Sequence, residues 1–342
     1  MKLFEELLNN TNIDFVNTEN YTETEWLNLR TTGIGGSDAG AIMGMNKYAT
    51  PLSVFIAKRN LLSEETKEKT ASNESIQWGK MAESAIRDGL AKDLELRIEP
   101  VPGMFTSTEY PFMNANLDGL VFADQPKEIN GKLISGLGGL EIKTATERNS
   151  EFTEDEVPDS YYCQVQHYMC VTHLDYFILA VLIGKVSGKI YVIPRNDDFI
   201  ERLVQRESEF WYENVAKDVM PEPVGNERES EVLNSLFSHA AKEVTLGEEF
   251  EELCKEYNNL SDKMKELKQQ QETIKERLKI AIFTETDTDE TATDKVIAKA
   301  GDCKITWTKQ LRKIVDTDAL KKANLFEEYS KNSESMVMRI SK

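Results

Sequence analysis

The sequence lacks the features of secreted and membrane proteins. No apolar run approaches the roughly 18 residues that a membrane-spanning helix requires. Residues 1–6 are acidic where a signal peptide needs a basic flank followed by an apolar stretch. Only four cysteines are present and no two form a CxxC pair, which excludes a disulfide framework and the common zinc and iron–sulfur knuckles. We therefore expect reduced thiols and a cytoplasmic location.

Positive charge is scarce as well. The chain has 41 Lys and Arg residues against 60 Asp and Glu, a formal net charge of −19. Residues 1–220 alone hold 21 basic and 35 acidic side chains. Because nucleic acids are polyanions, this balance excludes a uniformly basic surface that would bind them nonspecifically. Any nucleic-acid site must therefore be a local basic patch on an acidic protein.

The first 220 residues mix helical and strand patterns. Apolar residues recur every three or four positions in the stretches predicted as helices: 51–57, 76–94, 158–172 and 197–218. Runs rich in β-branched and aromatic residues, separated by turn residues, are predicted as strands: 94–98, 117–122, 140–144, 176–183 and 189–193. This order of elements predicts an α/β fold with a central mixed β-sheet flanked by helices.

The rest of the chain is organised differently. The Pro-containing stretch 221–225 predicts a linker, so we expect two domains, residues 1–220 and 221–342. From Phe250 to Leu278, positions that are apolar except for Gln271 alternate steps of three and four, which is the heptad pattern of a coiled-coil-like helix. The sequence leaves open whether this helix pairs with a helix over residues 230–242 or with a neighbouring subunit.

The end of the chain contains three shorter predicted elements. Residues 284–293 are acidic and Thr-rich, which predicts a loop. Residues 296–298 and 304–309 predict a small β-hairpin, and residues 317–324 predict a short helix with an N-cap.

The stretch Gly139–Thr144 has the pattern of a metal-dependent hydrolase. In a strand, Glu141 and Lys143 emerge on one face, and Asp118 at the start or end of an adjacent strand can bring a second carboxylate close. Asp118, Glu141 and the carbonyl of Ile142 would supply oxygen ligands for Mg²⁺, and Lys143 would orient or deprotonate the attacking water. Taken alone, these strings also fit an exposed strand face and a turn.

Polar groups on two predicted helices add to this pattern. Glu83 lies on the apolar side of its helix, where free acids are rare, although a structural salt bridge would also explain it. Tyr161 and Gln164 lie one turn apart on the helix over 158–172. Such groups near a metal site can hold the attacking water or a phosphate oxygen.

A glycine-rich segment, residues 32–40, suggests a phosphate site of another kind. It lacks the spacing of a dinucleotide-binding fingerprint and has no Gly-Lys-Ser/Thr, which excludes Rossmann and P-loop sites. We interpret it as a tight turn that brings Ser37 to the start of a helix over residues 38–43, with Arg30 close by to bind a phosphate. The alternative is that Ser37 is a plain N-cap.

These motifs together resemble the YqaJ-type viral recombinase nucleases, relatives of phage lambda exonuclease in the PD-(D/E)xK superfamily. Six ordered blocks carry the resemblance: residues 26–30 (WLNLR), 33–39 (GIGGSDA), 78–83 (WGKMAE), 116–119 (NLDG), 140–143 (LEIK) and 161–166 (YYCQVQ). One departure is that leucine precedes Asp118 where the family has proline, which leaves the metal ligand itself in place.

The resemblance implies an exonuclease core of the PD-(D/E)xK type over residues 1–220 and a helical extension with a terminal hairpin over residues 221–342. It implies a Mg²⁺-dependent enzyme, with Mn²⁺ as a substitute ion, that degrades linear duplex DNA from the 5′ end and leaves 3′ overhangs. The implied state is a ring-shaped homo-oligomer of phage or prophage origin in the bacterial cytoplasm. Its implied partners are DNA ends and a single-strand annealing recombinase, with no membrane.

The same sequence leaves other functions open. One alternative is a non-catalytic DNA-binding or assembly module on a nuclease fold, which would apply if Asp118, Glu141 and Lys143 did not converge. Another is a scaffold that recruits partners through the heptad helix. A third is a related endonuclease, because the same metal site cuts internally when DNA reaches it through an open cleft.

Overall fold

The structure is a computed structural model that describes residues 2–61, 74–146, 152–153, 156–184, 187–236, 244–285, 295–311, 313 and 315–330. The chain divides into two compact units, Met1–His239 and Ala240–Lys342. Each unit is described by itself. Unit 1 carries the predicted site residues and unit 2 carries the heptad helix.

Unit 1 is built around a five-stranded mixed sheet with the strand order β3-β6-β7-β8-β9. Its strands are β3 (Arg97–Glu99), β6 (Gly119–Ile129), β7 (Lys132–Ala145), β8 (Tyr176–Ile183) and β9 (Ser187–Pro194). Strands β7 and β8 run parallel, and the other neighbours run antiparallel. The predicted α/β fold with a central mixed sheet is confirmed.

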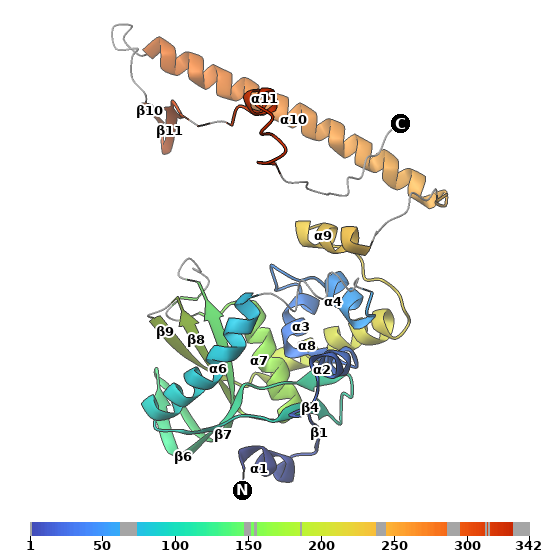
Figure 1. Ribbon diagram of the computed structural model, residues 1–342, viewed down its shortest axis with the longest axis vertical. Coiled ribbons are helices and arrows are strands. Elements are labelled where there is room, and N and C mark those ends of the chain that lie inside the picture. The colour runs from blue at the N-terminus through green and yellow to red at the C-terminus, as the bar shows by residue number, and fades with distance from the viewer. Residues whose placement is uncertain are drawn as a thin grey trace. The chain divides into compact units, whose positions relative to one another are not determined.

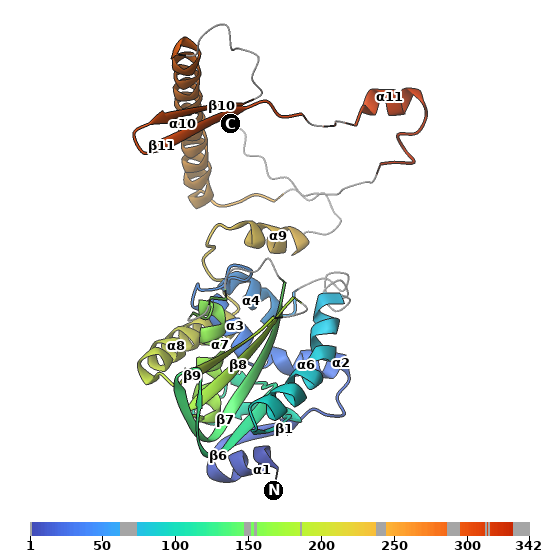
Figure 2. The same cartoon turned by 90° about the vertical axis from the view of Figure 1, so that its left-hand side faces the viewer.

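Helices cover both faces of this sheet, as Figures 1 and 2 show. The helices among the described residues of the unit are α1 (Leu3–Asn10), α2 (Glu23–Thr31), α3 (Gly36–Ile42), α4 (Pro51–Lys58), α6 (Glu74–Asp93), α7 (Asp159–Thr172), α8 (Asp197–Glu209) and α9 (Glu227–Leu236). On one face, Ile178 and Ala180 of β8 share a core cluster with Ile86 of α6. On the other, Phe177 and Leu179 join the larger core that contains α7. This alternation follows from the two-residue period of a strand.

A second sheet has the order β1-β4-β5-β2. Its strands are β1 (Ile13–Asn17), β4 (Gly103–Ser107), β5 (Met113–Ala115) and β2 (Ile34–Gly35). These strands are absent from the sequence prediction, as are α1 and α2. Strands of two to five residues contain too few alternations to give a clear periodicity.

The predicted helix over residues 197–218 changes type along its length. Helix α8 ends at Glu209 and continues as a π-helical turn, η1 (Phe210–Val215). In this wider turn, the rings of Trp211 and Tyr212 both lie against Phe112, with centroid distances of 6.2 and 5.5 Å.

The boundary of unit 1 lies beyond the predicted position at residue 220. Helix α9 packs against α4, and its Val232 and Leu233 contact the core of the unit. The predicted linker is tied to this helix, because the Glu229 carboxylate accepts hydrogen bonds from the N–H groups of Val224 and Gly225 at 2.7 and 2.9 Å.

Unit 2 contains the predicted long helix, hairpin and short helix: α10 (Glu249–Glu285), β10 (Lys295–Ala300), β11 (Cys303–Thr308) and α11 (Thr317–Lys322). The predicted N-cap of the short helix is Asp316, whose carboxylate accepts the N–H of Ala319 at 2.9 Å. Most of the predicted loop over residues 284–293 and the end of the predicted helix over 230–242 lie outside the described residues. Among the helices that the structure describes, none has the length and apolar content needed to cross a membrane.

Close packing between β7 and β8 gives the first prediction. A Cβ added at Gly139 would lie 2.2 Å from the buried ring of Phe177, so Gly139→Ala should destabilise the fold by about 1–3 kcal/mol through overpacking. Gly89 in α6 is the matched control, because a Cβ there meets nothing within 4 Å. Gly89→Ala should stabilise the protein by about 0.5–1 kcal/mol through helix propensity. Denaturant unfolding measures both, and equal effects of the two substitutions would contradict the packing argument.

Candidate active site

The two predicted carboxylate ligands meet at the paired ends of β6 and β7. Asp118 immediately precedes β6, whose first residue, Gly119, is in register with Leu140 of β7. The Asp118 carboxylate accepts a hydrogen bond from the N–H of Ile142 at 2.6 Å, which fixes it beside the strand that carries Glu141. Leu140 and Ile142 lie in the apolar cluster below α6, so Glu141 emerges on the opposite face.

Glu141 is held by two further predicted site residues. Its Oε1 accepts hydrogen bonds from Lys143 Nζ at 2.5 Å and from Gln164 Nε2 at 2.6 Å. Lys143 comes from the same face of β7, and Gln164 projects from α7, which connects β7 to β8. The structure therefore brings Asp118, Glu141, Lys143 and Gln164 together at one place.

The second oxygen of Glu141 marks the place where a cation would fit. Glu141 is buried, and its Oε2 has no hydrogen-bond partner among the described residues. Burial raises the pKa of the Glu141 carboxyl to about 8, with the Asp118 and Glu83 charges adding to the shift and Lys143 opposing it. A buried carboxylate oxygen without a partner costs free energy unless a proton or a cation satisfies it.

The other oxygen atoms that a cation beside Glu141 could use belong to Asp118 and to the backbone. Burial raises the pKa of the Asp118 carboxyl, although the N–H of Ile142 and the charge of Lys143 act in the other direction. Within the described part of the chain, no group of three or more His, Cys, Asp or Glu side chains is arranged to hold a metal. A cation here would bind Asp118, Glu141 and the carbonyl of Ile142, which are the hard oxygen donors that Mg²⁺ prefers.

Glu83 and Tyr161 border this site from two helices. Glu83 is half-buried on α6, close enough for its charge to raise the pKa of Glu141. The Tyr161 ring lies below the Lys143 ammonium, with Nζ 5.4 Å from the ring centroid, and stacks on Phe152 with a centroid distance of 5.4 Å. Tyr161 therefore contacts the site through Lys143.

Two residues that the sequence motifs do not single out complete the site. Arg87 of α6 donates a hydrogen bond at 2.7 Å to the carbonyl of Asp118 and fixes the backbone at that residue. Tyr168 of α7 accepts a hydrogen bond from Gln164 at 3.0 Å, and its buried ring lies against Gly36, where a Cβ would come within 2.4 Å. The spacing of four residues between Gln164 and Tyr168 is the one sequence signal that could have indicated this pair.

Arg30 and Ser37 also come together, at the start of α3. Arg30 donates a hydrogen bond to Ser37 Oγ at 2.9 Å and lies over the ring of Trp26, 4.9 Å from its centroid. Helix α3 begins at Gly36 and its N-cap is Gly35, so the alternative that Ser37 is the N-cap is wrong, and the helix starts two residues earlier than predicted.

The charges around Arg30 leave a net positive group. Lys58 of α4 pairs with Asp38 at 2.7 Å and donates to the carbonyl of Arg30 at 2.9 Å. Burial works against ionisation of Asp38, but Lys58 and then Arg30 outweigh it and lower the pKa of this carboxyl. Burial raises the pKa of the Tyr168 hydroxyl, the charges of Glu141 and Asp118 raise it further, and the charge of Arg30 lowers it.

The neighbouring polar residues of α7 have structural partners. His167 is buried, and its Nδ1 lies 2.9 Å from the carboxylate of Glu207 in α8, while its Nε2 lies 3.0 Å from the carbonyl of Asn114. Gln166 bridges the backbone of Pro194 and Asn196. The hydrogen bonds of these two side chains join α7 to the rest of the unit, and none of them involves Glu141.

The comparisons with known proteins agree with the motif pattern. Residues 25–175 match the family model of the YqaJ-like viral recombinase domain. The uncharacterized protein YqaJ of Bacillus subtilis (strain 168) is 29% identical over 264 residues, which are 75% of this chain and 76% of that protein. These matches confirm the resemblance to the YqaJ-type viral recombinases.

Solved structures with a similar chain path include an alkaline exonuclease from Laribacter hongkongensis. It matches with a TM-score of 0.41 and 19% identity over 57% of this chain and 93% of that chain. The same exonuclease in complex with dAMP matches with a TM-score of 0.40 and 18% identity over the same shares.

The raised pKa of Glu141 predicts how stability depends on pH in metal-free buffer. Between the usual pKa of a glutamate and about 8, the folded protein keeps a proton that the unfolded chain has lost, so unfolding becomes easier as pH rises. Glu141→Gln does not titrate, and its advantage in unfolding free energy over the wild type should grow from pH 5 to pH 8, to on the order of a few kcal/mol. Denaturant unfolding in EDTA measures this difference. The exposed Glu201→Gln is the control, and a pH-independent gap for Glu141→Gln would contradict the burial argument.

Proposed function

We propose that this protein is a Mg²⁺-dependent exonuclease that degrades linear duplex DNA from the 5′ end. The observation that carries the proposal is the buried Glu141, whose Oε2 lacks a partner among the described residues, next to Asp118, Lys143 and Gln164. Two carboxylates that can hold a metal ion, with a positioned ammonium and an amide beside them, form a set that suits metal-assisted phosphodiester hydrolysis. The match to the YqaJ-like viral recombinase domain supports a nuclease role in recombination.

The ligands proposed for Mg²⁺ are Asp118, Glu141 and the carbonyl of Ile142, with Mn²⁺ as a substitute. When bound, the ion supplies a Lewis acid that stabilises charge on the phosphate and makes water more acidic. Glu141 must lose its proton to act as a ligand, and with a pKa of about 8 it does so more completely at alkaline pH. Lys143 adds a further positive charge beside Glu141.

Lys143 acts as a hydrogen-bond donor in this proposal. Burial works against its charge, but Glu141 outweighs burial and raises the pKa of the ammonium. Lys143 is therefore charged at neutral pH and orients the attacking water or the scissile phosphate. Because a charged ammonium cannot accept a proton, the other role predicted from sequence, deprotonation of the water, is less favoured. Gln164 and Glu83 approach the same place from α7 and α6, where they position water or phosphate. The Tyr161 ring stabilises the Lys143 ammonium through a cation–π contact.

Arg30 and Ser37 form the proposed pocket for the terminal 5′-phosphate. The guanidinium offers several donors in a fixed fork that matches phosphate oxygens, and its described hydrogen-bond partner is the neutral Ser37 hydroxyl. Tyr168 contacts Gly36, next to Ser37, with its ring and Gln164, a partner of Glu141, with its hydroxyl, so a strand end bound at Arg30 would extend toward the carboxylates. Recognition of the end would distinguish an exonuclease from an endonuclease.

The wider setting is also proposed. The exonuclease would act as a ring-shaped homo-oligomer in the bacterial cytoplasm and leave 3′ overhangs for a single-strand annealing recombinase. An acidic exterior, with positive charge confined to the DNA path, would discourage DNA from binding elsewhere.

Substitution of the core site tests the chemistry. Asp118→Ala, Glu141→Ala and Lys143→Ala should each reduce Mg²⁺-dependent cleavage of linear duplex DNA about a thousand-fold or more, because each removes several kcal/mol of stabilisation of charge on the phosphate. The exposed Glu201→Ala should retain wild-type activity, and EDTA should abolish cleavage until Mg²⁺ is restored. Near wild-type turnover in any of the three folded variants would refute the site. Closed circular duplex is the second substrate, and its cleavage would identify an endonuclease.

Arg30→Ala tests end recognition. Loss of charge-assisted hydrogen bonds to the phosphate should lower kcat/KM for 5′-phosphorylated duplexes about ten- to a hundred-fold, with little effect on duplexes that lack the phosphate. Arg30→Lys should recover part of the loss, because it keeps the charge without the bidentate geometry. Equal slowing of both substrates would show that Arg30 serves general DNA affinity or packing instead.

A further inference from the structure

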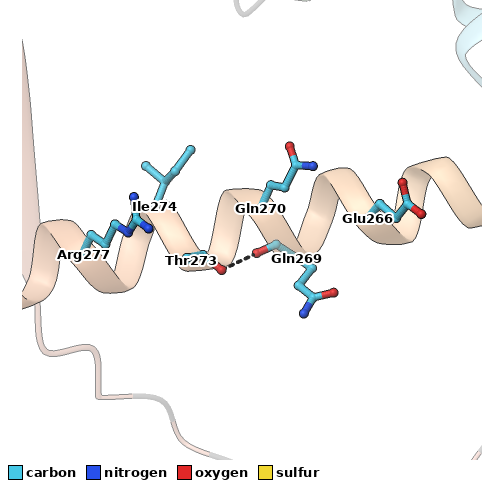
Figure 3. A pocket seen from close by; sticks show the side chains of 6 residues that line it. All are labelled: Glu266, Gln269, Gln270, Thr273, Ile274 and Arg277. Atoms are coloured by element: carbon cyan, nitrogen blue, oxygen red, sulfur yellow. Dashed lines mark hydrogen bonds between the residues drawn. The ribbon is translucent and has the colours of Figure 1, made fainter.

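Helix α10 exposes an apolar stripe that is interrupted by Gln271 at one a position. Its heptad a positions include Phe250, Tyr257, Met264 and Leu278, and its d positions include Leu253, Leu260, Leu267 and Ile274. We call these eight residues the heptad seam. Their exposed fractions range from 38% at Leu278 to 71% at Met264. Figure 3 shows Ile274 of the seam on the same side of the helix as Gln270, with Gln269 on the opposite side.

Such a stripe needs a partner. A helix of 37 residues gains most of its stability from packing an apolar face, and eight large side chains in water forfeit that stabilisation. Within unit 2, the described contacts of the hairpin lie near the carboxyl end of α10, where Lys279 lies over the ring of Trp307 and Ile282 is buried. The middle of the heptad seam, around Met264 and Leu267, stays exposed.

The acidic and basic residues of α10 are concentrated toward opposite ends of the helix. Residues 249–258 contain four acidic side chains and one basic side chain, whereas residues 268–279 contain four basic and two acidic ones. Two copies aligned antiparallel bring the acidic end of each helix to the basic end of the other. Complementary charge of this kind sets the orientation of a helix pair.

We propose that α10 is an interface between two copies of this chain, which pair antiparallel along the heptad seam. In the register that overlaps the helices most fully, Tyr257 faces Ile274 of the second copy and Met264 faces its Leu267. The flanking Glu256 then faces Arg277 of the second copy, and two-fold symmetry repeats this ion pair at the other end. A parallel pair would lose both ion pairs and place Lys263 beside Lys268 of the other copy.

This interface is separate from the proposed DNA site. An antiparallel pair is self-complementary and closes after two copies, so it joins chains in twos whatever assembly unit 1 forms. Mass and cross-linking measurements therefore test this interface independently of nuclease activity.

The first test removes apolar contact at the centre of the heptad seam in the full chain. Met264→Asp should halve the native mass measured by light scattering. Gln269→Asp, which adds the same residue on the opposite side of the helix, should leave the mass unchanged. Circular dichroism checks that both variants keep their helix content. An unchanged mass for Met264→Asp would overturn the proposal and mean that another part of the chain, or a different protein, covers the seam.

The second test uses charge reversal to determine whether the two helices pair antiparallel. Glu256→Lys should weaken self-association about ten-fold, because two ion pairs become two like-charge pairs. Adding Arg277→Glu to the same chain should restore the wild-type dissociation constant. These residues lie 21 positions apart on one helix, so they cannot compensate within a single copy. Failure of the double substitution to restore association would overturn the antiparallel register.

The third test uses disulfide trapping in a background with Cys254→Ser and Cys303→Ser, since both native thiols are exposed. A mixture of chains carrying Tyr257→Cys with chains carrying Ile274→Cys should give a mixed disulfide dimer under mild oxidation. Tyr257→Cys alone should not cross-link with itself. Efficient self-cross-linking of Tyr257→Cys would indicate a parallel pair and overturn the proposal.

Discussion

The parallel pairing of β7 with β8 is the constraint on which the candidate site depends. Parallel neighbours cannot be joined by a tight turn, so the chain must cross over, and it does so as α7. The crossover helix covers the face of β7 from which Glu141 projects, and it brings Gln164 within 2.6 Å of that carboxylate. The antiparallel partner on the other side, β6, brings Asp118 to the backbone of Ile142. One strand thus collects groups from both of its neighbours.

Glu141 shows the cost of this arrangement. A fully hydrogen-bonded carboxylate would be easier to bury, yet here Lys143 and Gln164 share one oxygen and leave the other without a described partner. Evolution of a core for stability alone would favour an apolar side chain at this position. A buried acid with a strongly shifted pKa is instead typical of a site where a ligand completes the coordination, and it is a physical argument for function that does not depend on likeness to other proteins.

Sequence patterns were sufficient where periodicity is strong or where strand alternation fixes a side chain. The faces of Glu141 and Lys143 follow from a period of two, and α10 follows from its heptads. The second sheet could not be predicted, because its strands are too short to show a period and its order joins segments distant in sequence. Arg87 and Tyr168 were missed for a related reason. The spacing of four residues links Tyr168 to Gln164, but the contact of Arg87 with the carbonyl of Asp118 and the packing of the Tyr168 ring at Gly36 are long-range and no local spacing encodes them.

The acidity of the chain becomes understandable when each positive group is considered with its partner. Lys58 pairs with Asp38 and Lys143 with Glu141, so these cations chiefly balance buried acids inside the unit. Arg30 bonds to a neutral hydroxyl, and its charge stays available to an anion. In the proposed function, a protein of net charge −19 cannot rely on broad attraction to DNA, so affinity would come from a few placed contacts together with the proposed assembly around the substrate. Self-association through α10 would multiply those few contacts by linking two copies, which raises avidity without adding a basic surface.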